Sequence, residues 1–80
     1  MTHNTAPLVD ATVAAIVDGN GDYAAYTVDV PADWSELAIK AYRATVILAL
    51  EMIDECAEVL ASMTGLNTVT FRIFDFNTNN

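Results

Sequence analysis

Apolar and polar residues alternate along the first third of the chain. From Leu8 to Asp18 every second residue is apolar on one face, and residues 22–30 repeat the pattern. Strict alternation of this kind predicts two half-buried strands. Asn20-Gly21 lies between them, and this dipeptide is typical of a type I′ turn, which needs positive φ at both central positions. The pattern therefore predicts a β-hairpin in which Val17 faces Ala24 and Ala11 faces Val30.

The pattern changes to a helical period between Asp33 and Thr64. The charged residues of this segment fall on one side of a helical wheel, and apolar residues cover the remaining arc of about 240°. Asp33 and Glu36 have capping-box spacing, and Gly65 follows as a C′ residue. A helix that rests on one sheet needs an apolar arc only a little over about 100° wide. We therefore expect one long helix that is covered on two sides.

A third strand is predicted from Thr68 to Phe76, with Val69, Phe71 and Ile73 on one face. The expected fold class is α+β, with the order ββαβ and a three-stranded, mainly antiparallel sheet packed on one long helix. Strand order 2-1-3 is favoured, and the alternative places the last strand beside the second through a right-handed crossover. Residues 1–7 are expected to be a flexible lead-in, 8–76 a single domain, and 77–80 a frayed end.

Charge and composition narrow the function. Eleven acidic residues against three basic ones give a net charge of −8, which argues against direct binding of nucleic acid. An acidic surface can serve solubility, or it can compete for a basic groove that holds DNA or RNA. The N-terminus lacks a basic segment before an apolar core, and no apolar run reaches the ~20 residues of a membrane span. We therefore expect a cytoplasmic protein with no membrane contact.

The predicted helix also points to self-association. About 31 helical residues span roughly 46 Å, whereas strands of about nine residues reach only ~30 Å. Apolar helix surface would then remain beyond the sheet, and we predict a homodimer built on helix–helix contact, with alanines such as Ala41 and Ala44 allowing close approach. The predicted dimer interface consists of Val46, Leu50, Ile53, Ala57 and Leu60. Cys56, the single cysteine, is expected to be a buried thiol.

Acidic residues on the C-terminal half of the helix form the predicted partner-binding surface. Four carboxylates recur at helical spacing there, although like charges at such spacing disfavour a helix. Ile47 is an apolar anchor in the polar stripe, or equally a chance surface residue. The predicted partner-binding residues are Glu36, Ile47, Glu51, Asp54, Glu55 and Glu58.

The sequence contains no complete motif for catalysis or for metal binding. Asp18 to Asp22 resembles the start of an EF-hand loop, but Tyr23 stands where that loop needs glycine and Asp29 where it needs glutamate. The helical carboxylates lack the histidines of carboxylate-bridged sites. No nucleophile–base pattern, P-loop or dinucleotide fingerprint occurs. We expect no enzyme activity, no metal and no cofactor.

A short acidic chain with a hairpin (Leu8–Val30), one helix (Asp33–Thr64) and a final strand (Thr68–Phe76) resembles the small phage-encoded inhibitors of bacterial defence, anti-CRISPR proteins in particular. The resemblance covers size, charge and layout, and no sequence motif or catalytic residue carries over. It implies an inhibitor that binds a nucleic-acid-handling defence complex in the host cytoplasm. The alternative is a small homodimeric structural or assembly protein, whose acidity serves only solubility.

Overall fold

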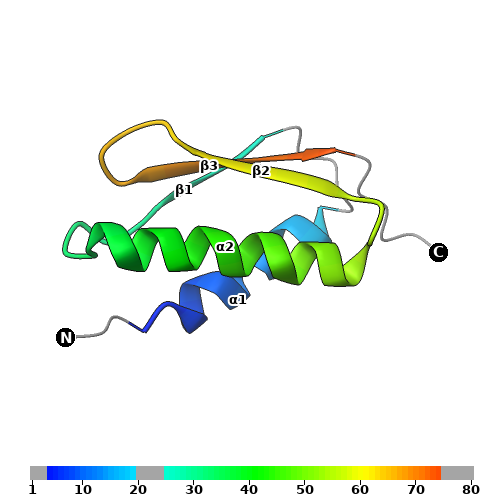
Figure 1. The fold of residues 1–80 in the computed structure, drawn as a ribbon, viewed down its shortest axis with the longest axis horizontal. Coiled ribbons are helices and arrows are strands. Elements are labelled where there is room, and N and C mark those ends of the chain that lie inside the picture. Colours follow the sequence, from blue (N-terminus) through cyan, green and yellow to red (C-terminus); the bar gives the residue numbers. More distant parts are fainter. Residues whose placement is uncertain (1–3, 20–24, 75–80) are drawn as a thin grey trace.

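The computed structural model describes residues 4–19 and 25–74. Its elements follow in the order α1 (Ala6–Asp18), β1 (Tyr26–Asp29), α2 (Glu36–Ile53), β2 (Glu58–Met63) and β3 (Thr68–Phe74). The three strands form an antiparallel sheet in the order β1-β3-β2. Both helices lie on the same side of this sheet, with α2 running along it and α1 packed against α2 (Figure 1). The fold class is therefore α+β.

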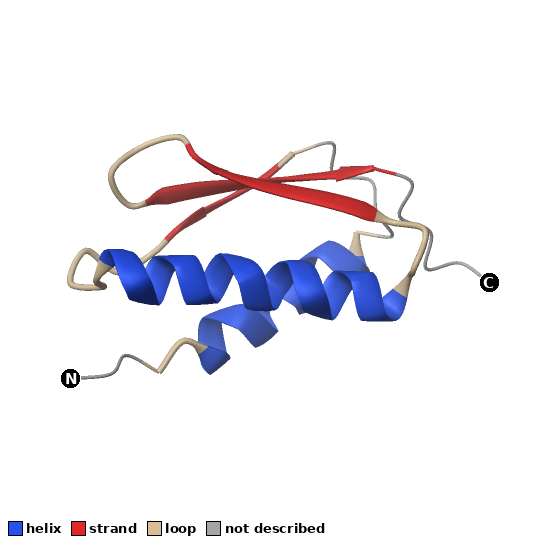
Figure 2. Ribbon diagram, viewed as in Figure 1, coloured by secondary structure: helices blue, strands red, loops and turns tan. Residues whose placement is uncertain are grey.

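The core lies between α2 and the inner face of the sheet. Val69, Phe71 and Ile73 alternate along β3 and are buried, which confirms the face predicted for this strand. Tyr42 stands at the centre, with its ring edge-on to Phe71 at a centroid distance of 5.7 Å. Val59 and Val30 close the core on either side of β3. The opposite face of the sheet carries no helix of the described chain (Figure 2).

The prediction of a strand over Leu8–Asp18 is wrong, because this segment forms helix α1. Pro7 lies in the first turn, where its missing N–H costs nothing. Val9, Thr12 and Ile16 are the buried positions, and their spacing of three and four residues is helical. Alanine fills several positions between them, so that the same segment also alternates, and alanine favours a helix.

The long helix predicted for Asp33–Thr64 is also wrong in its boundaries. Helix α2 begins after the N-cap Ser35, whose Oγ accepts a hydrogen bond from the Ala38 N–H at 3.1 Å. It ends at Asp54, which has extended backbone angles, and residues 58–63 form strand β2. Cys56 lies in the turn between them and is exposed, contrary to the prediction of a buried thiol.

The topology differs accordingly from ββαβ. Residues 26–29 form a strand as predicted, but they pair with β3 in antiparallel register, with Tyr26 opposite Phe71. Strand order 2-1-3 is wrong because the predicted first strand is a helix. The alternative placed the last strand beside the second, and β3 does lie beside β1, but the two are antiparallel, so the right-handed crossover is wrong. The predicted Asn20-Gly21 turn lies outside the described residues. Helix α1 begins two residues before the predicted domain boundary at residue 8.

Helix α2 is too short to leave the apolar overhang that was expected beyond the sheet. Helix α2 has 18 residues and spans about 27 Å, while the seven residues of β3 span roughly 23 Å. Little of the helix extends beyond the sheet. Apolar surface is nevertheless exposed, because Leu37, Leu48 and Met52 of α2 are 77%, 60% and 85% exposed.

Candidate protein-binding surfaces

Four acidic residues gather where α2 passes into β2. Glu51 lies in the last turn of the helix, Asp54 caps it, Glu55 lies in the connecting turn, and Glu58 begins the strand. The Asp54 carboxylate accepts a hydrogen bond from the Cys56 N–H at 3.0 Å, which stabilises the turn. Glu51, Glu55 and Glu58 are exposed, and Asp54 is half-buried. We call these four residues the acidic end.

Of the three basic residues, Lys40 and Arg43 lie away from the acidic end, whereas Arg72 lies near Glu58 on the outer face of the sheet, since Glu58 is opposite Phe74 and Leu60 is opposite Arg72. Lys40 and Arg43 lie in the N-terminal half of α2, and Arg72 lies on β3 opposite Leu60. Within residues 4–19 and 25–74, no three histidine, cysteine or acidic side chains converge in a way that would hold a metal ion. Met52 and Ile53, which follow Glu51 in the chain, expose apolar surface.

The other two predicted partner-binding residues lie elsewhere. Glu36 is the first residue of α2, fifteen residues before Glu51 and thus about 22 Å away along the helix. Ile47 is half-buried and packs against the core. Four of the six residues thus follow one another where α2 passes into β2, but they do not share one face, because Glu58 lies with Leu60 on the outer face of the sheet.

The predicted dimer-interface residues are divided between the core and the surface. Val46, Leu50 and Ala57 are buried within the chain, beneath the sheet. Ile53 and Leu60 are 51% and 53% exposed. Leu60 belongs to the outer face of the sheet, where it is paired with Arg72. These five residues therefore do not share one surface.

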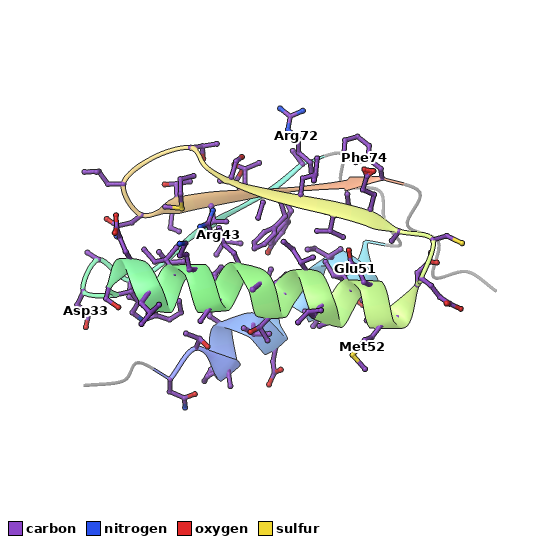
Figure 3. The ribbon with its side chains drawn as sticks, viewed as in Figure 1. Asp33, Arg43, Glu51, Met52, Arg72 and Phe74 are labelled. Carbon is purple, nitrogen blue, oxygen red and sulfur yellow. The ribbon has the colours of Figure 1, made fainter. Side chains whose placement is uncertain are left out.

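The outer face of α2 carries an apolar stripe that the sequence interpretation did not separate from the core face. Its members are exposed and recur at spacings of four, three, four and four residues: Leu37, Ala41, Ala44, Leu48 and Met52. This spacing resembles that of a coiled-coil seam, and it is the sequence feature from which the stripe could have been identified. Met52 points away from the sheet (Figure 3). We call these five residues the outer stripe.

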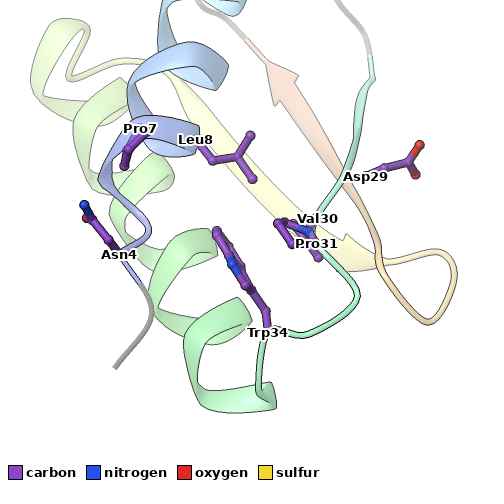
Figure 4. Close-up of a pocket in the computed structure, with 7 residues that line it drawn as sticks. All are labelled: Asn4, Pro7, Leu8, Asp29, Val30, Pro31 and Trp34. Carbon is purple, nitrogen blue, oxygen red and sulfur yellow. The ribbon is translucent and has the colours of Figure 1, made fainter. Parts of the chain in front are cut away.

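The described surface also has hollows. One, of about 580 Å³, lies between the start of α1 and the β1–α2 connection and is lined mainly by apolar atoms, including Leu8, Val30 and Trp34 (Figure 4). The other, of about 400 Å³, lies between α2 and the β2–β3 connection, where Lys40, Arg43 and Leu66 line it. The Nε atom of Arg43 is buried there and has no hydrogen-bond partner among the described residues.

Comparison of the chain with models of protein families, with curated proteins and with solved structures gives no significant match. Neither helix of the described residues combines the length and apolar character needed to cross a bilayer.

Proposed function

We propose that this chain is a non-enzymatic protein-binding inhibitor, which uses its acidic end to occupy a basic surface of a complex that handles nucleic acid. The observation that supports this function is the succession of four acidic residues where α2 passes into β2: Glu51, Glu55 and Glu58, which are exposed, and Asp54, which is half-buried. Carboxylates presented in this way can replace phosphates on a surface built from lysine and arginine. Because the four side chains come from a helix end, a capped turn and a strand, their backbone positions are held before binding, which limits the ordering cost.

The resemblance to anti-CRISPR proteins in size and charge supports a CRISPR-Cas-type defence complex as the partner. In this proposal the chain is encoded by a phage or mobile element and acts in the host cytoplasm. Exposed Met52 and Ile53 beside the acids add apolar contact, since charge pairs alone give steering and specificity more than affinity. Binding should weaken as salt is added.

The test is capture of partners from a bacterial lysate with the tagged chain and with an acidic-end variant. The variant E51Q/E55Q/E58Q removes three charges and retains Asp54, whose carboxylate stabilises the turn. We expect the wild-type chain to retain a nucleic-acid-binding protein that the variant does not retain, and we expect double-stranded DNA or RNA to displace it.

A matched control removes the same number of charges elsewhere. The variant D10N/D18N/D33N changes three exposed acids outside the acidic end and leaves the chain with the same net charge as the first variant. Retention of the partner by this control is expected. Equal capture by both triple variants, or a captured protein that nucleic acid does not displace, would contradict the proposal.

A second function, homodimeric assembly, is favoured by a different observation. Leu37, Leu48 and Met52 are all more than half exposed on one helix face, and an apolar patch of this kind marks a contact surface on a soluble chain. In this case the acidity of the chain serves only solubility. Sedimentation of the wild-type chain over a range of concentrations tests it, and a monomer throughout would contradict it.

A further inference from the structure

The outer stripe lies opposite the core on α2. With 100° per residue, its five members fall within an arc of about 80°, whereas the buried residues Ile39, Tyr42, Val46 and Leu50 centre on the other side of the helix. Thr45 borders the stripe and donates its hydroxyl proton to the Ala41 carbonyl at 2.7 Å. Its polar group is therefore satisfied within the helix, and no polar group of the stripe needs a partner.

Large and small residues are placed symmetrically along the stripe. Leu37 and Met52 are equidistant from the midpoint between Ala44 and Thr45, and so are Ala41 and Leu48. A second α2 that runs antiparallel across this midpoint therefore places Leu37 against Met52 and Ala41 against Leu48. Ala44 and Thr45 meet at the centre, where small side chains let the helices approach closely.

The charges beside the stripe have the same symmetry. Lys40 and Glu51 lie on one flank of the stripe, on opposite sides of the same midpoint. Their distances from this midpoint differ by two residues, or about 3 Å along the helix. In an antiparallel pair of helices equal flanks meet, so that Lys40 of each copy faces Glu51 of the other. Neither side chain forms an ion pair with another described residue of its own chain. In a parallel pair opposite flanks meet, so Lys40 and Glu51, which share a flank, would not face each other.

We infer that the occupant of the outer stripe is a second copy of this chain, bound through an antiparallel, two-fold α2–α2 contact with two Lys40–Glu51 pairs. This inference rests on the second proposed function and specifies its surface. The dimer surface is thus the outer stripe and not the buried residues Val46, Leu50 and Ala57. An interface confined to one helix per copy is at the small end of the size range, so the experiments must extend to high micromolar concentration.

Charge exchange tests the arrangement by sedimentation equilibrium. Lys40→Glu and Glu51→Lys each create like-charge pairs across the two-fold axis, and each is expected to raise the dimer dissociation constant about tenfold. The double variant K40E/E51K restores opposite charges and is expected to return to the wild-type value. An equimolar mixture of K40E and E51K is expected to form a mixed dimer more tightly than either variant pairs with itself.

Net charge provides the control. Glu51→Lys makes the chain less negative, so a general reduction of repulsion would strengthen self-association, whereas the inferred contact requires weakening. Glu58→Lys makes the same change in charge on β2, away from the stripe, and is expected not to weaken the dimer. Circular dichroism of each variant confirms that it is folded.

The possible results separate the inference from the function on which it rests. A wild-type chain that stays monomeric at high micromolar concentration overturns both. A wild-type dimer that E51K does not weaken, or that K40E/E51K does not restore, overturns the antiparallel contact and leaves homodimerisation intact. Restoration by the double variant, together with the mixed dimer, supports the inferred contact.

Discussion

One buried pair of hydroxyl groups joins the two helices. Thr12 of α1 donates its single hydroxyl proton to the Leu8 carbonyl at 2.7 Å, so Tyr42 of α2 must be the donor in the 2.8 Å contact between the two side chains. Thr12 is 2% exposed and Tyr42 is fully buried. Because water does not reach this site, the loss of either partner is costly.

We expect Tyr42→Phe to lower the free energy of unfolding by about 0.5–1.5 kcal/mol, and Thr12→Val by about 1–3 kcal/mol because it leaves a buried donor without a partner. The double variant should cost less than the sum of the two. Urea unfolding of the four proteins measures this coupling. Thr45→Val is the matched control, since it removes the same kind of hydroxyl-to-carbonyl bond on the exposed side of α2 and should have a much smaller effect. Strictly additive costs would contradict the assigned hydrogen bond.

The same burial makes stability depend on pH. Desolvation raises the pKa of Tyr42 above its ordinary value of 10.0, because the buried phenolate is disfavoured. Below pH 10 both folded and unfolded chains hold this proton, so its contribution to stability is fully present. Above pH 10 the unfolded chain loses the proton first, and stability falls until the folded pKa is passed. Urea unfolding between pH 8 and 11 should show a steeper decline for the wild-type chain than for Tyr42→Phe; superimposable profiles would contradict this.

At the scale of elements, the hydrophobic residues of α1 and of β2 each fit both the two-residue repeat of a strand and the 3.6-residue repeat of a helix. In residues 8–18 several positions are alanine, which can lie on a buried or an exposed face. The segment therefore fits both strand alternation and a helical repeat. In residues 58–63 Val59 and Leu60 extend the apolar arc of a helix, although Val59 and Ala61 in fact share the inner face of a strand. Local pattern does not decide such segments. Residues 58–63 form a strand because they pair with β3, and α1 packs against α2.

The prediction is correct where the hydrophobic pattern fits only a strand or only a helix. The alternation of Val69, Phe71 and Ile73 with polar residues fits a strand and no amphipathic helix, and β3 has this face buried. The middle of α2 likewise forms as expected. Its N-terminus was placed too early because Asp33 and Glu36 have capping-box spacing, whereas Ser35 provides the cap.

At the scale of the whole molecule, the acidic end could be anticipated because its residues are close in sequence and remain close whether residue 54 continues a helix or ends one. The outer stripe could not be anticipated. Which side of α2 is free depends on where the sheet and α1 pack, and these contacts join residues far apart in the chain, such as Thr12 and Tyr42. The sheet covers Val46 and Leu50, and the outer stripe is what remains.

The net charge of −8 leads to a prediction in which salt acts in opposite directions on folding and on partner binding. Compact packing of this many like charges destabilises the fold through self-repulsion, and added salt screens it. The free energy of unfolding should therefore rise when NaCl is increased from about 20 mM to 500 mM, and it should rise less in E51Q/E55Q/E58Q. Binding of the basic partner should weaken over the same range, because salt also screens the attraction between opposite charges. Urea unfolding and partner capture at matched salt concentrations measure the two effects. Capture that is insensitive to salt while folding responds would show that the acidic end destabilises the fold without contributing to recognition.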